Sequence, residues 1–245
     1  MLIRLSELKN FQLRATDGDI GRCRDFLFDD EYWAIRYMEA NTSKWLLGQR
    51  VLISPKALQS ADLPADRIEL NISKKQVEEA PGIEQDQPVS RQYEQAYANY
   101  FKHGFYWIGG AVWGAGHNPY TVEPPVPQDT PTQDLPEAAD DEHLRSTEKV
   151  RGYAVQARDG EIGSIDDFIV ETADWRIALL GIDTRKWLPG RTVLLPVEWV
   201  RDISWQERHV EVDVTRDALK SAPELKEPVT YVDVESFCEH FDRTR

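Results

Sequence analysis

Cysteine is scarce in this chain, and so are basic residues. Only two cysteines occur among 245 residues, and 29 Lys and Arg stand against 43 Asp and Glu, a formal net charge of −14. Two unmatched cysteines, Cys23 and Cys238, disfavour a disulfide framework or a Cys-based metal site. Nucleic acids are held largely through Lys and Arg contacts to phosphates. The charge therefore disfavours nucleic acid as a partner.

Long apolar runs and catalytic motifs are missing as well. No stretch reaches the roughly 18 apolar residues that span a bilayer, and residues 1–7 lack the apolar centre of a signal peptide. We therefore expect a cytoplasmic protein. No Gly-rich phosphate loop, Gly-x-Ser-x-Gly or Cys/His nucleophile pattern occurs. The five histidines show no ligand spacing. We expect no catalytic residues, no metal, no cofactor and no enzymatic activity.

What the chain does contain is a repeat. Residues 17–52 recur as residues 159–194, at an offset of about 142 residues, and such self-similarity indicates a repeated structural unit. The copies share Asp-Gly-(Asp/Glu)-Ile-Gly, then Asp-Phe, Trp and Lys-Trp-Leu-x-Gly. The register continues without a gap to Ala80-Pro81 and Ala222-Pro223. A match of this length indicates a duplicated domain.

Each copy has the pattern of a small sheet followed by a helix. Asp17-Gly18 lies between two β-type runs and predicts a hairpin. The strands expected in the first copy are 10–14, 22–28, 33–40, 49–53 and 67–72, and those in the second are 164–170, 175–182, 191–195 and 209–214. Ser73 and Thr215 are candidate N-caps of the following helices. Short strands without βαβ alternation favour one small antiparallel barrel per copy.

The predicted organisation has four parts. Residues 1–87 form the first barrel, and residues 88–147 comprise an aromatic helix, an aromatic and Gly-rich segment, and a Pro-rich acidic linker. Residues 148–226 form the second barrel, and residues 227–245 a C-terminal helix. The fold class expected is mainly β with short helices, in two tandem small barrels related by internal duplication.

The aromatic segment, Phe105–Trp113, is the first candidate interaction site. Its large rings are those of Phe105, Tyr106, Trp107 and Trp113. Exposed, this run would be an adhesive patch for a protein partner, a second subunit or a membrane surface. Alternatively, it fills the groove between the two barrels. The acidic sequence that follows disfavours a membrane surface.

Two repeated features offer further candidates. Lys44-Trp45 and Lys186-Trp187 enter a predicted strand, where the Trp either presents an anchor to a partner or plugs the end of its own barrel while the Lys extends to solvent. Asp25 and Asp167 resemble acid/base or metal-binding carboxylates. A turn-stabilising hydrogen bond explains their repetition equally well, and we favour that explanation.

The repeated residues also resemble a known family. Each copy is similar to a PRC-barrel domain, the module of the cytoplasmic part of the photosynthetic reaction-centre H subunit and of the ribosome-maturation factor RimM. The resemblance covers about residues 5–80 and 148–222 and is nearest in kind to stand-alone bacterial PRC-barrel proteins. It implies a strongly bent sheet closed into a barrel and used to dock onto other proteins, although fold does not fix function.

The expected function is a non-enzymatic protein-interaction or adaptor module with a protein partner, and paired homologous units are also compatible with a homo-oligomer. A first alternative is a ribosome- or RNA-associated maturation role, which rests on the RimM resemblance and is opposed by the charge. A second alternative is a small-ligand sensor that uses the cleft between the barrels.

Overall fold

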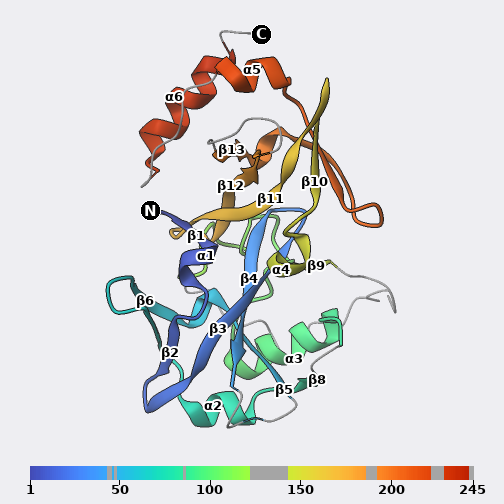
Figure 1. Ribbon diagram of the computed structural model, residues 1–245. Helices are drawn as coiled ribbons and strands as arrows, with labels where there is room; N and C mark the ends of the chain where they lie inside the picture. Colours follow the sequence, from blue (N-terminus) through green and yellow to red (C-terminus); the bar gives the residue numbers. More distant parts are fainter. Residues whose placement is uncertain are drawn as a thin grey trace. The chain divides into compact units, whose positions relative to one another are not determined.

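The computed structural model describes residues 1–42, 46, 49–84, 87–121, 143–185, 192–221 and 229–242. The chain divides into an N-terminal unit, Leu8–Ser146, and a C-terminal unit, Met1–Glu7 with Thr147–Arg245. Both units are mainly β with short helices, in agreement with the expected class (Figure 1). Helix α1 (Leu5–Leu8) contains one of the two points at which the chain passes between the units.

The N-terminal unit is one curved sheet with two helices. In chain order its elements are β2 (Gln12–Ala15), β3 (Gly18–Asp29), β4 (Ala34–Asn41), β5 (Gln49–Ile53), the 3-10 helix η1 (Pro55–Ala57), β6 (Leu58–Asp62), β7 (Arg67–Leu70), α2 (Lys74–Glu79), β8 (Ile83–Glu84), α3 (Arg91–Phe101) and β9 (Leu144–Ser146). The strands pair in the order β6-β7-β2-β3-β4-β5-β8, and β9 also pairs with β3.

The C-terminal unit runs through a similar order. Its elements are β1 (Leu2–Arg4), α4 (Thr147–Val150), β10 (Ala154–Ala157), β11 (Gly160–Glu171), β12 (Arg176–Asp183), β13 (Thr192–Pro196), the 3-10 helix η2 (Val197–Trp199), β14 (Val200–Ser204), β15 (His209–Val212), α5 (Arg216–Ser221) and α6 (Tyr231–Asp242). The strands pair in the order β14-β15-β10-β11-β12-β13, and β1 also pairs with β11.

The sheets differ from the closed antiparallel barrels that the sequence predicts. The pairs β2–β7 and β10–β15 are parallel, which is possible because a long stretch of chain separates the two strands of each pair. Among the described residues, the end strands β6 and β8 of the N-terminal unit do not pair with each other, and β8 has only two residues. The sheet is therefore open, and the barrel closure expected from the sequence is corrected.

Each unit contains a strand that is continuous in sequence with the other unit. Strand β1 pairs antiparallel with β11, with Leu2 opposite Glu171 and Arg4 opposite Ile169. Strand β9 pairs with β3 in the same way, with Leu144 opposite Asp29. In Figure 1 the blue β1 lies along the yellow β11, although their colours mark distant parts of the sequence. We call β1 and β9 the exchanged strands. The predicted boundaries at residues 87 and 148 assigned β1 to the first barrel and β9 to the linker, and so did not include these two pairings.

Glycine allows a close approach between β3 and the end of β4. Gly21 has φ 143°, and a Cβ there would lie 2.2 Å from the carbonyl oxygen of Asn41 at the end of β4. Gly163 repeats this arrangement against Asp183 in the C-terminal unit. Trp33 and Trp175, expected as first residues of strands, instead have positive φ in the turns before β4 and β12.

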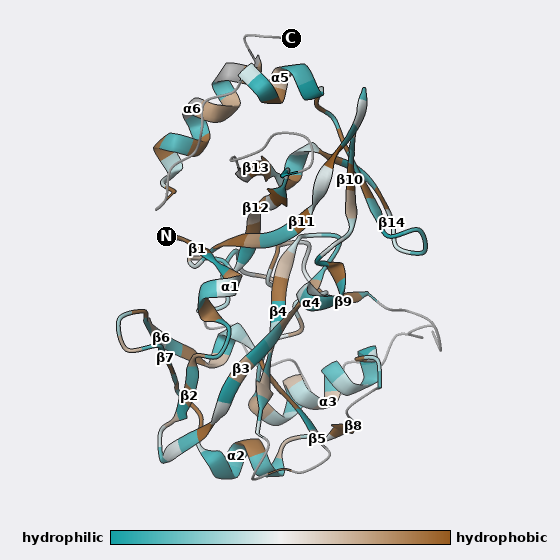
Figure 2. Cartoon of the chain, viewed as in Figure 1, coloured by the Kyte–Doolittle hydropathy of each residue, from teal (hydrophilic) through white to brown (hydrophobic). Residues whose placement is uncertain are grey.

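The core of the N-terminal unit lies between the sheet and α3. Leu27, Tyr37, Leu52 and Tyr97 are buried together there, and the Tyr97 hydroxyl accepts a hydrogen bond from the Ser54 amide at 3.0 Å. Tyr93, Tyr97 and Phe101 of the predicted aromatic helix thus lie on the inner face of α3. The predicted capping box of α2 is also present, since Ser73 and Gln76 bond each other's backbone. In Figure 2, α2 and α5 are mainly hydrophilic and β12 is mainly hydrophobic.

Candidate interaction site

The aromatic segment, Phe105–Trp113, packs on the N-terminal unit. Helix α3 is capped at its C-terminal end by Lys102, whose positive φ of 56° turns the chain out of the helix. Two isolated β-bridges, Ala111–Gly114 and Trp113–Gly116, then close a tight loop. Gly109 permits this loop, because a Cβ there would lie 2.7 Å from the backbone of Gly114.

Arg36 of β4 holds the inner side of the segment. Its side chain has no exposed surface and forms an ion pair with Asp29 of β3. Its Nη1 donates a hydrogen bond to the Val112 carbonyl at 2.6 Å. The guanidinium carbon lies 3.9 Å from the ring centre of Tyr106 and 4.8 Å from that of Trp113. One arginine therefore fixes both a backbone carbonyl and two rings of the segment.

The electrostatics at Arg36 are those of a buried charge. Burial raises the pKa of Asp29, and Arg36 opposes that rise. The Nη2 atom of Arg36 is buried and has no hydrogen-bond partner among the described residues. The two aromatic faces supply electrostatic compensation, because a cation is attracted to the electron-rich face of a ring.

Glu94 of α3 is a second buried anchor. Its side chain has no exposed surface, and it accepts hydrogen bonds from the Tyr106 hydroxyl at 2.8 Å and from Arg91 at 2.9 Å. His143, just before β9, approaches the same carboxylate to 2.6 Å. Burial first, and then the charge of Glu94, raises the pKa of Tyr106, which keeps the phenol protonated as the donor. Glu94 thus joins three separate parts of the chain.

The outer side of the segment is a surface that we call the Phe105–Ile108 surface, formed by Phe105, Trp107 and Ile108. The rings of Phe105 and Trp107 stack with centroids 4.9 Å apart and planes 11° apart. Arg91 lies over the Trp107 ring at 4.4 Å. Phe105 and Trp107 are half-buried, and Ile108 is 51% exposed. The segment therefore has a buried side and a side that faces solvent.

The predicted site residues fall into three groups. Trp113 is 1% exposed and Tyr106 is held by Glu94 and Arg36, so these two are anchors. Phe105 and Trp107 lie at the surface. Lys44, Trp45, Lys186 and Trp187 lie outside the described residues, and their role stays a prediction.

Sequence reasoning missed Arg36, Glu94 and His143. A signal for Arg36 was present, because it is the one charged residue in the run Ala34–Met38, and Ala178 takes the corresponding place in the second copy. Glu94 and His143 carry no such local signal, because polar residues on a helix and beside a linker usually face solvent.

Asp25 and Asp167 bind backbone and hydroxyl groups. Each accepts a hydrogen bond from the next residue's amide, at 2.8 Å and 2.9 Å. Asp25 also accepts one from the Ser146 hydroxyl, and Asp167 from that of Ser6, both at 2.5 Å. These carboxylates lie within β3 and β11 rather than in turns, where they hold the exchanged strands.

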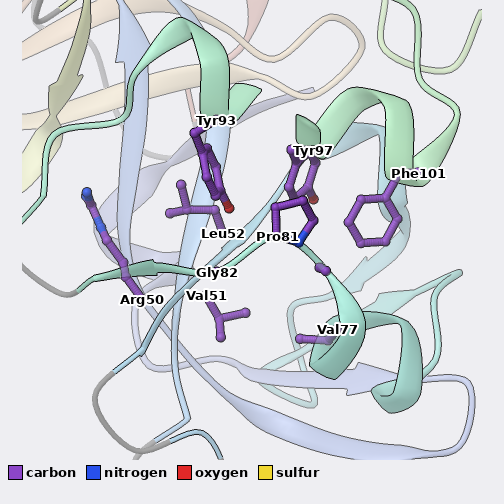
Figure 3. Close-up of a pocket in the computed structure, with 10 residues that line it drawn as sticks. Arg50, Val51, Leu52, Val77, Pro81, Gly82, Tyr93, Tyr97 and Phe101 are labelled. Carbon is purple, nitrogen blue, oxygen red and sulfur yellow. The ribbon is translucent and has the colours of Figure 1, made fainter. Parts of the chain in front are cut away.

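A small pocket lies beside α3 (Figure 3). Arg50, Val51 and Leu52 of β5, Val77 of α2, the turn at Pro81 and Gly82, and the rings of Tyr93, Tyr97 and Phe101 line it. Its interior volume of about 10 Å³ is near the lower limit for one water molecule. This pocket is too small for a metabolite. Among the described residues, no group of three His, Cys, Asp or Glu is arranged to bind a metal.

The described residues thus form a mainly β chain whose sheet is not closed, with an aromatic segment anchored by Arg36 and Glu94. Residues 143–219 match the family model of the PRC-barrel domain, so the chain contains a PRC-barrel domain in this region. No curated protein matches the chain. No helix among the described residues is long and apolar enough to cross a membrane.

Proposed function

We propose that this chain is a non-enzymatic protein-interaction or adaptor module, and that the Phe105–Ile108 surface is its docking surface. One observation carries the proposal: the aromatic segment is divided into an anchored side and a solvent-facing side. Tyr106 and Trp113 face Arg36, whereas Phe105 and Trp107 are half-buried and Ile108 is 51% exposed.

The anchoring has a physical consequence for binding. Ordering a flexible loop on association costs free energy, and a surface already held in place avoids that cost. Glu94 and Arg36 hold the segment through two hydrogen bonds, of 2.8 Å to Tyr106 and 2.6 Å to Val112. Stacked aromatic rings beside an arginine are also the residue types that dominate binding energy at protein interfaces.

We further infer that the chain is built from two tandem PRC-type units related by internal duplication. Strands β3 and β11 each have 12 residues, and Gly21 and Gly163 have φ values of 143° and 141°. The exchanged strands β1 and β9 also occupy corresponding positions on β11 and β3. A resemblance to the PRC-barrels of the reaction-centre H subunit and of RimM supports a docking role, because relatives use the module to bind proteins.

The test compares three full-length proteins as bait in affinity purification from the native host. The first is unchanged, the second carries Trp107→Ser with Ile108→Ser, and the third carries Val232→Ser on α6. Val232 is 72% exposed and lies outside the segment, so it is a matched loss of exposed apolar surface. A protein recovered with the first and third baits is then purified, and its Kd for each bait is measured by calorimetry.

We expect the purified partner to bind the double variant at least about tenfold more weakly, which corresponds to about 1.4 kcal/mol. Circular dichroism and a thermal melt establish that the double variant is folded. Equal affinity for all three baits would contradict the assignment of the docking surface. Turnover of a defined metabolite by the unchanged protein would contradict the non-enzymatic function.

A further inference from the structure

The acceptor for β1 is a complete binding site on the C-terminal unit. Strand β1 pairs with β11, and Leu2 packs against the hydrophobic cluster that contains Ile169 and Leu179. Arg4 reaches Asp167 at 3.4 Å, and the same carboxylate accepts hydrogen bonds from the backbone and hydroxyl of Ser6. Backbone pairing, the packing of Leu2 and a carboxylate therefore recognise this segment.

The polypeptide chain continues from β1 through α1 into the N-terminal unit. The division between the units falls at Glu7–Leu8, within α1. The pairing of β1 with β11 and the contacts of Arg4 and Ser6 with Asp167 are made to the C-terminal unit, whereas β1 is covalently continuous with the N-terminal unit. These contacts do not depend on which copy of the chain supplies the strand. This is the condition under which strands exchange between protein molecules.

The second exchanged strand shows that the acceptor arrangement recurs. Strand β9 lies on β3 with Leu144 opposite Asp29, and Ser146 donates to Asp25. In both units, a carboxylate in the middle of the long strand binds a hydroxyl group from the exchanged segment.

We propose that the β11 edge also binds the β1 segment of a second copy of this chain, giving a dimer by reciprocal exchange of β1. The segment Leu2–Ser6 fits the acceptor in hydrophobic pattern and in charge. The chain's own strand competes at an effective concentration in the millimolar range, so exchange increases with protein concentration. The inference does not depend on the proposed docking surface, because it uses different residues.

Disulfide trapping tests the proposal with full-length protein. The Thr172 amide donates to the Met1 carbonyl at 3.0 Å, which makes Leu2 and Glu171 a non-hydrogen-bonded pair. Such a pair has Cα atoms about 4.5 Å apart, which suits a disulfide. One chain carries Leu2→Cys, and a second, distinguishable by a size tag, carries Glu171→Cys. Both also carry Cys238→Ser, and they are mixed, incubated and oxidised.

The matched control mixes the Glu171→Cys chain with an Arg176→Cys chain. Arg176 also pairs with Glu171, but both residues belong to the β11–β12 hairpin of one chain. Exchange of β1 therefore does not bring these two positions of different chains together. We expect a covalent heterodimer from the first mixture, several-fold above the control and rising with concentration. A single chain with both Leu2→Cys and Glu171→Cys should cross-link internally, which shows that the pair can form a disulfide.

Internal cross-linking without heterodimer at any concentration would overturn the proposal, as would equal heterodimer in the control mixture. If the double variant does not cross-link, Arg4→Cys and Ile169→Cys provide the next non-hydrogen-bonded pair. A synthetic peptide of residues 1–8 should reduce the heterodimer, and a scrambled peptide should not. Equal inhibition by both would mean that the edge accepts any extended segment, which would also overturn the assignment.

Discussion

At the scale of single residues, the buried Arg36 is the central feature of the N-terminal unit. Taking an ion pair out of water is costly, and removal of one partner leaves the other charge uncompensated. Arg36 has several compensating contacts, with Asp29, the Val112 carbonyl and two aromatic rings. Its location at the base of the aromatic segment makes it important for the presentation of the proposed docking surface.

Arg36→Ala should therefore lower the free energy of unfolding by about 3–5 kcal/mol, the usual cost of breaking a buried ion pair. The matched change is Arg24→Ala, because Arg24 also pairs with a strand carboxylate but its side chain is 56% exposed. This change should cost less than about 1 kcal/mol. Urea denaturation of the two variants measures the difference, and equal losses would contradict the role given to Arg36.

His103 provides a prediction for pH. Burial, and then the charge of Lys56, lowers the pKa of His103 to about 4 from its usual 6.5. Between these values the unfolded chain binds more protons at this residue than the folded chain. Stability from His103 is therefore present above pH 6.5 and is lost as the pH falls toward 4, by up to about 1.4 kcal/mol per pH unit.

The difference in unfolding free energy between the unchanged protein and His103→Gln isolates this effect from the carboxylates. We expect the unchanged protein to lose stability relative to the variant between pH 6.5 and pH 4.5. Urea unfolding at several pH values measures the difference. A difference that is constant over this range would show that His103 becomes protonated equally easily in both states.

At the scale of elements, the long strands β3 and β11 depend on a close backbone approach near their start, to β4 and β12. Gly18 and Gly21 have nearly the same φ, 140° and 143°, but different surroundings. A Cβ at Gly18 would meet only a lysine side chain at 3.6 Å, whereas one at Gly21 would meet the Asn41 carbonyl oxygen at 2.2 Å. Substitutions at the two positions can therefore be compared to separate the cost of backbone strain from the cost of a steric collision.

Gly21→Ala should thus be more destabilising than Gly18→Ala. Positive φ costs each variant of the order of 1–3 kcal/mol. The collision adds to this cost at position 21, because backbone atoms of two paired strands must move apart. Thermal unfolding of both variants measures the order. The opposite order would mean that β3 and β4 can move apart at Gly21 at little cost in free energy.

At the scale of the whole molecule, the exchange of strands makes sequence neighbours belong to different units. Ile3 precedes the N-terminal unit in sequence, yet it is buried and pairs with Val170 of β11 in the C-terminal unit. Leu144 lies just before residue 147, where the C-terminal unit resumes, yet it pairs with Asp29 of β3 in the N-terminal unit. Damage to either strand should therefore appear far away in sequence.

Ile3→Asp should increase amide hydrogen exchange in β11, residues 160–171, with little change in β3, residues 18–29. An unpaired charge would replace a side chain that is 4% exposed, so β1 should leave its acceptor. Leu144→Asp should show the reverse pattern. Hydrogen exchange followed by mass spectrometry measures both. Loss of protection in β3 alone from Ile3→Asp would contradict the assignment of β1 to β11.

Much of the fold could be predicted from local patterns in the sequence. The capping residues of α2, the Asp-Gly hairpin and the tyrosine stripe of α3 depend on neighbours a few residues away. The aromatic segment could also be located from composition. Its anchors Arg36, Glu94 and His143 could not, because the burial of a charged side chain depends on distant residues that surround it.

The sequence by itself determined the mainly β class, the repeated pattern and the position of the aromatic segment, since hydrophobic periodicity, turn residues and caps act over short distances. Only the tertiary structure decided that the sheets stay open, that Arg36 is buried, and that β1 pairs with β11. Strand pairing is made mainly by backbone hydrogen bonds, which are similar for all residues. A three-residue strand therefore carries little sequence information about its partner.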